Sequence, residues 1–203
     1  MKRYMIKEQF LSIQGEGYWS GRPAVFIRFS NCNLWSGEES DRANAICTFC
    51  DTDFTAGASW RRDALVTNAR RLAGDATMVI LTGGEPALQI DRELVEALHD
   101  AGFYVAIETN GTLPIPDTID WVCVSPKTPK LRITTGHELK LVYPQERITP
   151  GLFEFLDFDH LWLSPMNDGE HLNAANAAAA YDYCLTHPRW RLNTQAHKVI
   201  GVR

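Results

Sequence analysis

Short apolar segments alternate with helical segments along most of this 203-residue chain. The apolar segments are predicted to be strands, at residues 4–13, 24–30, 77–82, 103–107, 121–124, 138–142 and 160–163, with a last extended piece at 191–202. Helices are expected at about residues 59–73, with Ser59 as the N-cap, and at 91–101 and 171–187. Repeated alternation of this kind predicts a parallel sheet or barrel built from β–α units.

The number of helices limits which barrel the chain can form. Only three segments have the helical pattern, because residues 111–119 and 128–136 are marked as loops by proline and glycine. A complete eight-fold β/α barrel typically takes about 250 residues. The sequence therefore predicts an α/β fold, an incomplete TIM-like barrel of about six parallel strands with few helices. We expect one domain spanning residues 1–203.

Polar clusters directly follow four of the expected strands. They are TGGE at residues 82–85, ETNG at 108–111, SPK at 125–127 and SPMN at 164–167. The carboxyl ends of parallel strands share one face, and that face carries the site in barrels and open sheets. A single cluster could be a loop that satisfies its own hydrogen bonds, but four on the same side indicate a binding face.

Three of the five cysteines lie close together in one polar stretch. Cys47 and Cys50 form a CxxC pair, which can turn both sulfur atoms toward one point, and Cys32 lies upstream. A structural zinc site takes four protein ligands, whereas Cys123 and Cys184 are predicted to be small core residues. Three thiolates would leave one iron of a four-iron cluster without a protein ligand and open for chemistry. The sequence favours such a cluster over a zinc site.

Two features before the cysteines indicate ligand binding. The motif Gln14-Gly15-Glu16-Gly17 follows the first strand, and its glycines would let the backbone approach a ligand while Glu16 points toward it. A hairpin turn is the alternative for this motif taken alone. Arg28 is the only charged residue in its apolar strand. An arginine in such a strand either extends its guanidinium to solvent or binds an anionic ligand. Because the strand leads directly to Cys32, we favour a ligand role for Arg28.

Charge and hydropathy argue against several classes of protein. The formal net charge is −5, whereas a general nucleic-acid binder needs a basic face. No apolar run approaches the length of a membrane span, and the segment MKRYMIKEQF lacks the apolar region of a signal peptide. An odd number of cysteines without an export signal indicates a reducing compartment. We therefore expect a cytoplasmic protein without nucleic-acid or membrane partners.

Taken together, the motifs resemble those of a known family. Three cysteines ahead of a GGEP strand end are similar to those of radical S-adenosylmethionine enzymes, and the whole set resembles the 7-carboxy-7-deazaguanine synthases of queuosine biosynthesis. The resemblance runs from Ile6 to the C-terminus and rests on LSIQGEG, RFSNCNLW, CTFCDT, LTGGEPALQ, AIETNGT, CVSPK, ELKLV and LNTQAHK. The usual radical-enzyme spacing is C-x3-C-x2-C, whereas this chain has C-x14-C-x2-C, an insertion that some members of the family share.

The resemblance implies a [4Fe–4S] cluster held by Cys32, Cys47 and Cys50, whose open iron binds S-adenosylmethionine. One electron, from an unidentified donor, cleaves this cofactor to a 5′-deoxyadenosyl radical. In the family the radical takes a hydrogen from 6-carboxy-5,6,7,8-tetrahydropterin, the ring contracts, ammonia leaves and 7-carboxy-7-deazaguanine results. The chain would thus be a carbon–nitrogen lyase, and the resemblance also implies a homodimer. The polar, acidic insertion at about 36–45 is expected to form a solvent-exposed loop whose two ends are held by the cluster.

The resemblance also assigns roles to single residues. Those expected to bind S-adenosylmethionine are Gly84, Glu85, Glu108, Ser125, Pro126, Lys127, Ser164, Pro165, Met166 and Asn167. Those expected to bind the pterin are Ile13, Gln14, Gly15, Arg28 and Thr82, with Glu16 and His197 as catalytic candidates beside it. Two positions depart from the family, since Asn31 stands where glycine is frequent and Ser164 where glutamine is usual.

Two further roles have simple alternatives. Thr52, two residues beyond Cys50, is expected to hold a magnesium ion, because magnesium prefers hard oxygen ligands and keeps several waters. A local bond that caps the turn is the alternative for this threonine. The terminal carboxylate of Arg203 is expected to accept hydrogen bonds from the pterin ring, as in related enzymes. A frayed tail is the alternative there.

Two other functions stay open at this stage. The first is a glycyl-radical-enzyme activase, which shares the NCNLW-like region but leaves Gln14–Gly17, Arg28 and the terminal QAHK without a role. The second is a non-catalytic binding module stabilised by zinc. Such a module would be colourless and contain stoichiometric zinc.

Overall fold

The computed structural model describes residues 2–169 and 171–202 of the chain. These residues form two compact units, each of which is built from several segments. The first unit contains Met1–Ser12, Pro23–Thr109 and Leu113–Val122, and the second contains Ile13–Arg22, Asn110–Thr112 and Cys123–Arg203. No helix among the described residues is long and apolar enough to cross a membrane.

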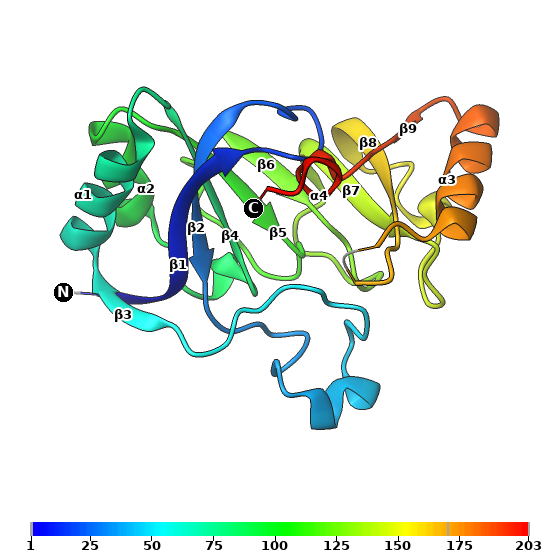
Figure 1. Cartoon of the computed structure of the whole chain (residues 1–203), viewed down its shortest axis with the longest axis horizontal. Coiled ribbons are helices and arrows are strands. Elements are labelled where there is room, and N and C mark those ends of the chain that lie inside the picture. Colours follow the sequence, from blue (N-terminus) through cyan, green and yellow to red (C-terminus); the bar gives the residue numbers. More distant parts are fainter. Residues whose placement is uncertain (1, 170, 203) are drawn as a thin grey trace. The chain divides into compact units, whose positions relative to one another are not determined.

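The first unit is built on a mostly parallel sheet. Its strands are β1 (Arg3–Ile13), β2 (Pro23–Phe29), β3 (Ala58–Arg61), β4 (Met78–Gly83) and β5 (Tyr104–Thr109), as Figure 1 shows. They lie in the order β3-β1-β2-β4-β5. The pairs β2–β4 and β4–β5 are parallel, whereas β3 is antiparallel to β1. The strands predicted from the apolar segments in this part of the chain are confirmed, to within a few residues at their ends.

Two helices cover the core of the first unit. They are α1 (Arg62–Ala73) and α2 (Arg92–Asp100), which lie on the same side of the strands in Figure 1. Leu65 of α1 and Leu94 of α2 are fully buried against Ile27 of β2 and its neighbours. Asp91 caps α2, since its side chain accepts a hydrogen bond from the backbone N–H of Leu94 at 2.9 Å. The apolar faces of these helices therefore close the core from that side.

The predicted N-cap of the first helix is wrong. Ser59 lies in β3, opposite Met5 of β1, and its hydroxyl accepts a hydrogen bond from Arg3 Nε at 2.7 Å. The helix begins at Arg62, and Arg61 has no side-chain cap. Pairing with β1 holds Ser59 in an extended conformation, so a tertiary contact outweighs the local preference of serine for a helix start.

The second unit contains the remaining parallel strands. They are the last two residues of β6 (Trp121–Val124), then β7 (Thr135–Tyr143), β8 (Asp157–Pro165) and β9 (Trp190–Leu192), paired in that order. Helix α3 (Ala174–Thr186) begins after Asn173, whose side chain accepts the N–H of Asn176 at 3.0 Å. Only Ala180 of this helix is fully buried, against β8 and β9, and Leu172 lies before the helix and is exposed.

The predicted extended piece at residues 191–202 is largely wrong. The strand β9 ends at Leu192, and a short helix, α4 (Ala196–Ile200), follows it. The N–H of Ala196 donates to the carbonyl of Gly15 at 2.9 Å, so the helix starts from a contact with a distant segment. Gly201 ends the helix in the left-handed conformation, with φ of 69°.

Three short 3-10 helices complete the described elements, and they are η1 (Glu39–Asn44), η2 (Pro86–Leu88) and η3 (Pro150–Leu152). Parallel strands dominate both units, and the helices are few. The predicted α/β class with a mostly parallel sheet is therefore confirmed.

Candidate functional site

The cysteine loop of the first unit begins at an unusual backbone position. Asn31, which follows β2, has φ of 72°, a left-handed conformation that asparagine tolerates better than most residues. This conformation accommodates asparagine at a position where the resemblance implied glycine. The next residue is Cys32, so the end of β2 turns sharply into the loop that carries the thiols.

The three cysteines of this loop are not in disulfides and lie in partly or fully buried positions. Cys47 is buried, whereas Cys32 and Cys50 are half-buried and pack against a small apolar cluster of Trp35, Ala45 and Phe54. Burial raises the pKa of the Cys32 thiol, and the nearby charges of Glu85 and Cys50 act in the same direction. Cys32 and Cys50 are thus close enough to interact.

This donor set fits a four-iron cluster. Among the described residues, no three histidine, cysteine or acidic side chains converge on a point where one metal ion would bind. A four-iron cluster makes no such demand, because each thiolate binds a different iron at a different corner of the cluster. Three thiolates from one loop are the donors that such a cluster takes from a protein when one iron is left open. Cys123, by contrast, is buried in β6, and Cys184 is half-buried in α3.

The GGEP segment lies against the start of the cysteine loop. A Cβ atom at Gly84 would lie 2.1 Å from the carbonyl oxygen of Asn31, so only glycine fits there. The N–H of Glu85 donates to the same carbonyl at 2.8 Å. The Glu85 side chain is fully buried and accepts hydrogen bonds from Thr109 Oγ1 at 2.6 Å and Ala87 N–H at 2.9 Å. It therefore ties the end of β4 to the end of β5.

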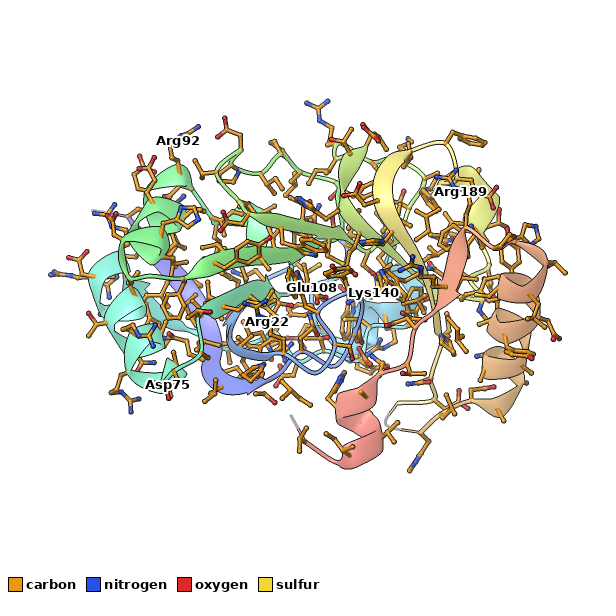
Figure 2. All side chains as sticks on the ribbon, turned by 90° about the horizontal axis from the view of Figure 1, so that it is seen from above. Arg22, Asp75, Arg92, Glu108, Lys140 and Arg189 are labelled. Atoms are coloured by element: carbon orange, nitrogen blue, oxygen red, sulfur yellow. The ribbon has the colours of Figure 1, made fainter. Side chains whose placement is uncertain are left out.

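Arg28 and Thr82 are direct neighbours across the β2–β4 pair. The Arg28 guanidinium forms an ion pair with Glu8 of β1 at 2.8 Å, and both side chains are about one-fifth exposed. The anion expected beside Arg28 is thus supplied, in this structure, by a carboxylate of the chain itself. Glu108, which Figure 2 labels, lies near the end of β5 and is half-buried.

In the second unit, Gln14–Gly17 begins a hairpin turn. The N–H of Gln14 donates to the carbonyl of Arg22 at 2.8 Å, and the N–H of Gly21 donates to the carbonyl of Gln14 at 2.7 Å. The Gln14 side chain accepts the N–H of Glu16 at 3.2 Å. The hairpin is present, and it also delivers Glu16 into a network of polar side chains, so the two interpretations of this motif are compatible.

Glu16 is the centre of that network. Its carboxylate forms an ion pair with Lys140 of β7 and accepts a hydrogen bond from Gln195 Nε2 at 2.6 Å. Gln195 accepts in turn from Asn167 Nδ2 at 2.6 Å. Figure 2 shows Lys140 among the packed side chains of this unit, whereas Arg189 lies at its periphery.

These contacts determine the ionisation of Glu16. Burial alone would raise the pKa of the Glu16 carboxyl, but the Lys140 ammonium and the hydrogen bonds from Lys140 and Gln195 outweigh it and lower the pKa to about 2. His197 lies close enough to act in the same direction. Glu16 is therefore an ionised hydrogen-bond acceptor at neutral pH, and a weak base.

His197 packs directly against Gly15. A Cβ atom at Gly15 would lie 2.0 Å from His197 Nδ1, so the glycine makes room for the imidazole. The structure thus brings together Gly15, Glu16 and His197, which belong to two motifs at opposite ends of the sequence.

Four polar residues of this network were not predicted to have a role. They are Glu138, Lys140, Asn193 and Gln195. A signal was present in ELKLV, because Glu138 and Lys140 alternate with Leu139 and Leu141, and all four are buried. Charged residues in a buried strand are rare unless they are paired. That pattern could have predicted a buried polar network.

Ser164 and Asn167 sit at the end of β8 within this network. Ser164 Oγ accepts a hydrogen bond from Asn193 Nδ2 at 2.8 Å. Among the described residues, Asn167 Oδ1 is buried and has no hydrogen-bond partner, although its amide nitrogen is bonded. Buried acceptors are nearly always paired, so this oxygen is a candidate ligand contact.

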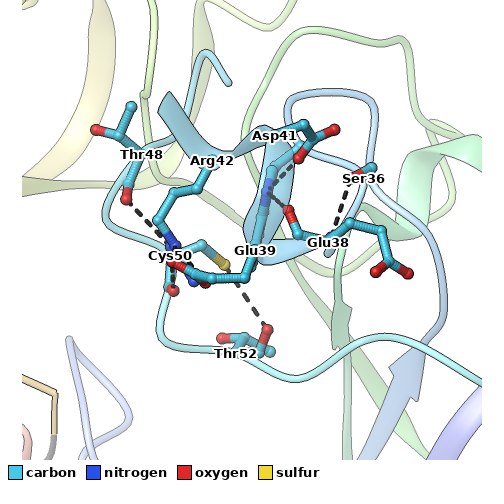
Figure 3. A network of polar contacts seen from close by, with 9 residues as sticks. Ser36, Glu38, Glu39, Asp41, Arg42, Thr48, Cys50 and Thr52 are labelled. Carbon is cyan, nitrogen blue, oxygen red and sulfur yellow. Dashed lines mark hydrogen bonds and ion pairs between the residues drawn. The ribbon is translucent and has the colours of Figure 1, made fainter. Parts of the chain in front are cut away.

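The other predicted binding residues occupy separate places. Lys127 donates to the Ser125 hydroxyl at 2.6 Å and to its carbonyl at 3.2 Å, and Pro126 between them is buried. Thr52 lies at the end of the cysteine loop, with its carbonyl oxygen 3.8 Å from Cys50 Sγ (Figure 3). Arg203 lies outside the described residues.

Comparison with known proteins places the chain in a family. The Radical SAM superfamily pattern matches residues 40–139. A protein of Bradyrhizobium diazoefficiens named 7-carboxy-7-deazaguanine synthase is 50% identical, over 98% of this chain and 99% of its own length. One of the same name from Bordetella pertussis is 51% identical over the same shares. The chain belongs to the 7-carboxy-7-deazaguanine synthase family.

The fold agrees with this assignment. A solved structure described as QueE from Escherichia coli has a TM-score of 0.70 at 24% identity and covers 96% of this chain and 95% of its own. An incomplete TIM-like β/α barrel is thereby confirmed as the fold class. The superfamily match begins inside the insertion, so it includes Cys47 and Cys50 but not Cys32. The full-length relatives, in contrast, match nearly the whole chain.

Proposed function

We propose that the chain converts 6-carboxy-5,6,7,8-tetrahydropterin to 7-carboxy-7-deazaguanine with loss of ammonia. The sequence identity carries the proposal: the chain is 50% and 51% identical to two proteins that are named for this product. The three cysteines in one loop, none of them in a disulfide, agree with it. When bound, the cluster and S-adenosylmethionine supply a one-electron reduction and a hydrogen-abstracting radical. The chain itself binds, orients and shelters the reactants.

We propose that the strand ends bind S-adenosylmethionine. Gly84 would offer backbone atoms to the amino group, and the buried Glu85 would hold that backbone in place. Glu108 would accept hydrogen bonds from the ribose hydroxyls, because a half-buried carboxylate is a strong acceptor for them. The remaining contacts are proposed for Ser125, Pro126, Lys127, Ser164, Pro165, Met166 and Asn167, with Asn167 Oδ1 supported by its lack of a partner among the described residues.

We propose that the Glu16 network recognises the pterin. Its ionised carboxylate can accept N–H groups from a ring edge, and His197 can hold or move a proton beside it. Ile13, Gln14, Gly15, Arg28 and Thr82 are the other proposed pterin contacts, with Arg28 presented to the substrate carboxylate by its partner Glu8. Arg203 is a further proposed contact with the pterin ring.

The remaining proposals concern partners. Thr52 would hold a magnesium ion together with oxygen atoms of the substrate. An unidentified electron donor, a homodimeric assembly and a cytoplasmic location complete the proposal. Neither a nucleic acid nor a membrane has a role in it.

Anaerobic purification followed by iron, sulfide and zinc analysis tests the cluster. We expect about four irons per chain in the parent, and loss of iron in Cys32→Ala, Cys47→Ala and Cys50→Ala. Cys123→Ala is the matched control and should keep its iron, at a packing cost of ~1–3 kcal/mol. A colourless protein with stoichiometric zinc would favour the zinc-stabilised binding module and overturn the proposal.

Turnover with the pterin tests the reaction. The reduced enzyme should form 7-carboxy-7-deazaguanine from the tetrahydropterin with no protein substrate present. The activase alternative requires a partner protein on which a glycyl radical forms. Cofactor cleavage that depended on such a partner, and not on the pterin, would contradict the proposal.

A further inference from the structure

The insertion between Cys32 and Cys47 forms a closed loop on the chain. The N–H groups of Ile46 and Cys47 both point to the carbonyl oxygen of Leu34, at 3.0 and 3.4 Å. If residues 35–45 are left out, Asn33, Leu34 and Ile46 are the three residues between the two cysteines. The C-x14-C segment is therefore a C-x3-C segment with residues 35–45 inserted, and the two hydrogen bonds join the ends of the insertion.

The insertion also packs back against the cysteine loop. Its ends, Trp35 and Ala45, are buried with Phe54, and the rings of Trp35 and Phe54 meet edge to face at 5.6 Å. Gly37 has φ of 90°, and a Cβ atom there would lie 2.5 Å from Thr55 Cγ2. Between these two ends, residues 36–44 include no buried residue. The solvent-exposed loop expected at about 36–45 thus describes residues 36–44, whereas Ala45 is buried.

Arg42 connects the insertion to the CxxC turn (Figure 3). One guanidinium nitrogen, Nη1, donates to the carbonyl oxygens of both Thr48 and Cys50, each at 3.1 Å. Its Nε donates to the two carboxylate oxygens of Glu39 at 2.9 and 2.8 Å. The guanidinium also lies over the Trp35 ring, 4.0 Å from its centroid. One side chain therefore holds the turn, the helix η1 and the apolar cluster together.

The position of Trp35 is itself determined by the insertion. Its indole N–H donates to Asp41 Oδ1 at 3.0 Å and to the Glu38 carbonyl at 3.2 Å. The ring is thus a fixed surface on which the Arg42 guanidinium stacks. Lysine should replace this arginine only in part, because an ammonium group donates hydrogen bonds but lacks the planar fork that stacks on the indole ring.

We infer that Arg42 is a positioning residue for the cluster, acting through the CxxC turn. The carbonyl oxygens of Thr48 and Cys50 both accept a hydrogen bond from the Arg42 guanidinium. This positive charge offsets the repulsion between the two oxygens and so preorganises the turn that carries Cys47 and Cys50. The insertion thus restrains the loop that carries the cysteines, and the hydrogen bonds from Arg42 are the contact through which it does so. This inference rests on the proposed binding of the cluster by Cys32, Cys47 and Cys50.

The test compares Arg42→Met and Arg42→Lys with Arg71→Met in the full chain. Arg71 donates to Asn68 within its own helix, α1, and is the matched control for loss of one arginine. After anaerobic reconstitution, the rate of iron loss to a chelator should rise about tenfold or more in Arg42→Met, the effect of one lost charge-assisted hydrogen bond. Arg42→Lys should lie between Arg42→Met and the parent, and Arg71→Met should match the parent.

Amide hydrogen exchange supplies a readout that is independent of turnover. Exchange should rise in peptides covering residues 46–52 of Arg42→Met and stay unchanged in the buried strand β4. If Arg42→Met fails to fold, Arg42→Lys against Arg71→Lys decides the same question. Iron loss and exchange equal to the control would overturn the inference. Failure of Cys47→Ala to lose iron would instead overturn the proposed cluster, so the two failures are distinguishable.

Discussion

The carboxylate of Glu138, in β7, accepts the backbone N–H of Tyr18 at 2.7 Å. Asn193 Oδ1 accepts the N–H of Gly17, next to it, at 2.8 Å. Two buried side chains from strand β7 and the segment after β9 thus hold the tip of the hairpin that carries Glu16. The loop proposed to bind the pterin is therefore held in place by side-chain acceptors in the core of the second unit.

Gly17→Ala should destabilise this hairpin. A Cβ atom at Gly17 would lie 2.3 Å from Glu138 Oε2, and the residue has φ of 66°. We expect a loss of ~2–4 kcal/mol in the free energy of unfolding and weaker pterin binding, since steric overlap adds to backbone strain. Gly21→Ala is the control in the same hairpin, because its φ is 88° but no described atom lies within 4 Å of a Cβ there. Equal losses in urea unfolding would mean that contact with Glu138 is irrelevant.

Lys140→Met should destabilise the second unit by ~3–5 kcal/mol, because it leaves the Glu16 carboxylate, whose side chain is only 15% exposed, without its cation. The double variant Lys140→Met/Glu16→Gln removes both charges and should recover most of that loss. Thermal or urea unfolding of the three proteins measures both effects. If the double variant were no more stable than Lys140→Met, the ion pair would not account for the destabilisation.

The same pair predicts a stability change at acid pH. The Glu16 pKa is lowered from an ordinary 4.5 to about 2 in the folded chain. A lowered carboxyl pKa contributes stability above the ordinary value, and this contribution is lost as pH falls from 4.5 toward 2. Urea unfolding over this range should therefore show a steeper decline for the parent than for Lys140→Met/Glu16→Gln. Parallel declines would assign the acid sensitivity to other carboxylates, such as Asp91, whose pKa is also lowered.

Thr52→Ala tests the proposed magnesium site. The variant should keep its iron and its uncoupled cleavage of S-adenosylmethionine, because the thiols are untouched, but lose the rate increase that added magnesium brings. Thr52→Ser keeps the hydroxyl and is the control. Steady-state rates with and without magnesium measure the effect. A magnesium response in Thr52→Ala equal to that of the parent would leave Thr52 as a turn residue.

Local sequence patterns were sufficient to predict the elements that depend on near neighbours. The apolar strands, the helix capped by Asp91 and the CxxC turn follow from periodicity and spacing, which act over a few residues. The combination of Cys32, Cys47 and Cys50 with the GGEP strand end also indicated the family from sequence motifs alone. The predicted strands, the helix and the family were confirmed, and no distant contact opposes these local patterns. The ligand role of the three cysteines stays a prediction.

Which polar residues meet, in contrast, depends on tertiary contacts. The partner of Glu16 is Lys140. Lys140 reaches Glu16 because the side of the buried strand β7 that carries Glu138 and Lys140 faces the hairpin. Strand pairing also overrode the cap preference of Ser59, and the helix at residues 196–200 begins where Ala196 N–H donates to the Gly15 carbonyl. A buried charge must find an opposite charge or hydrogen-bond partners, but its sequence neighbours do not specify which ones. That choice depends on strand register and loop closure, which link residues far apart in the chain.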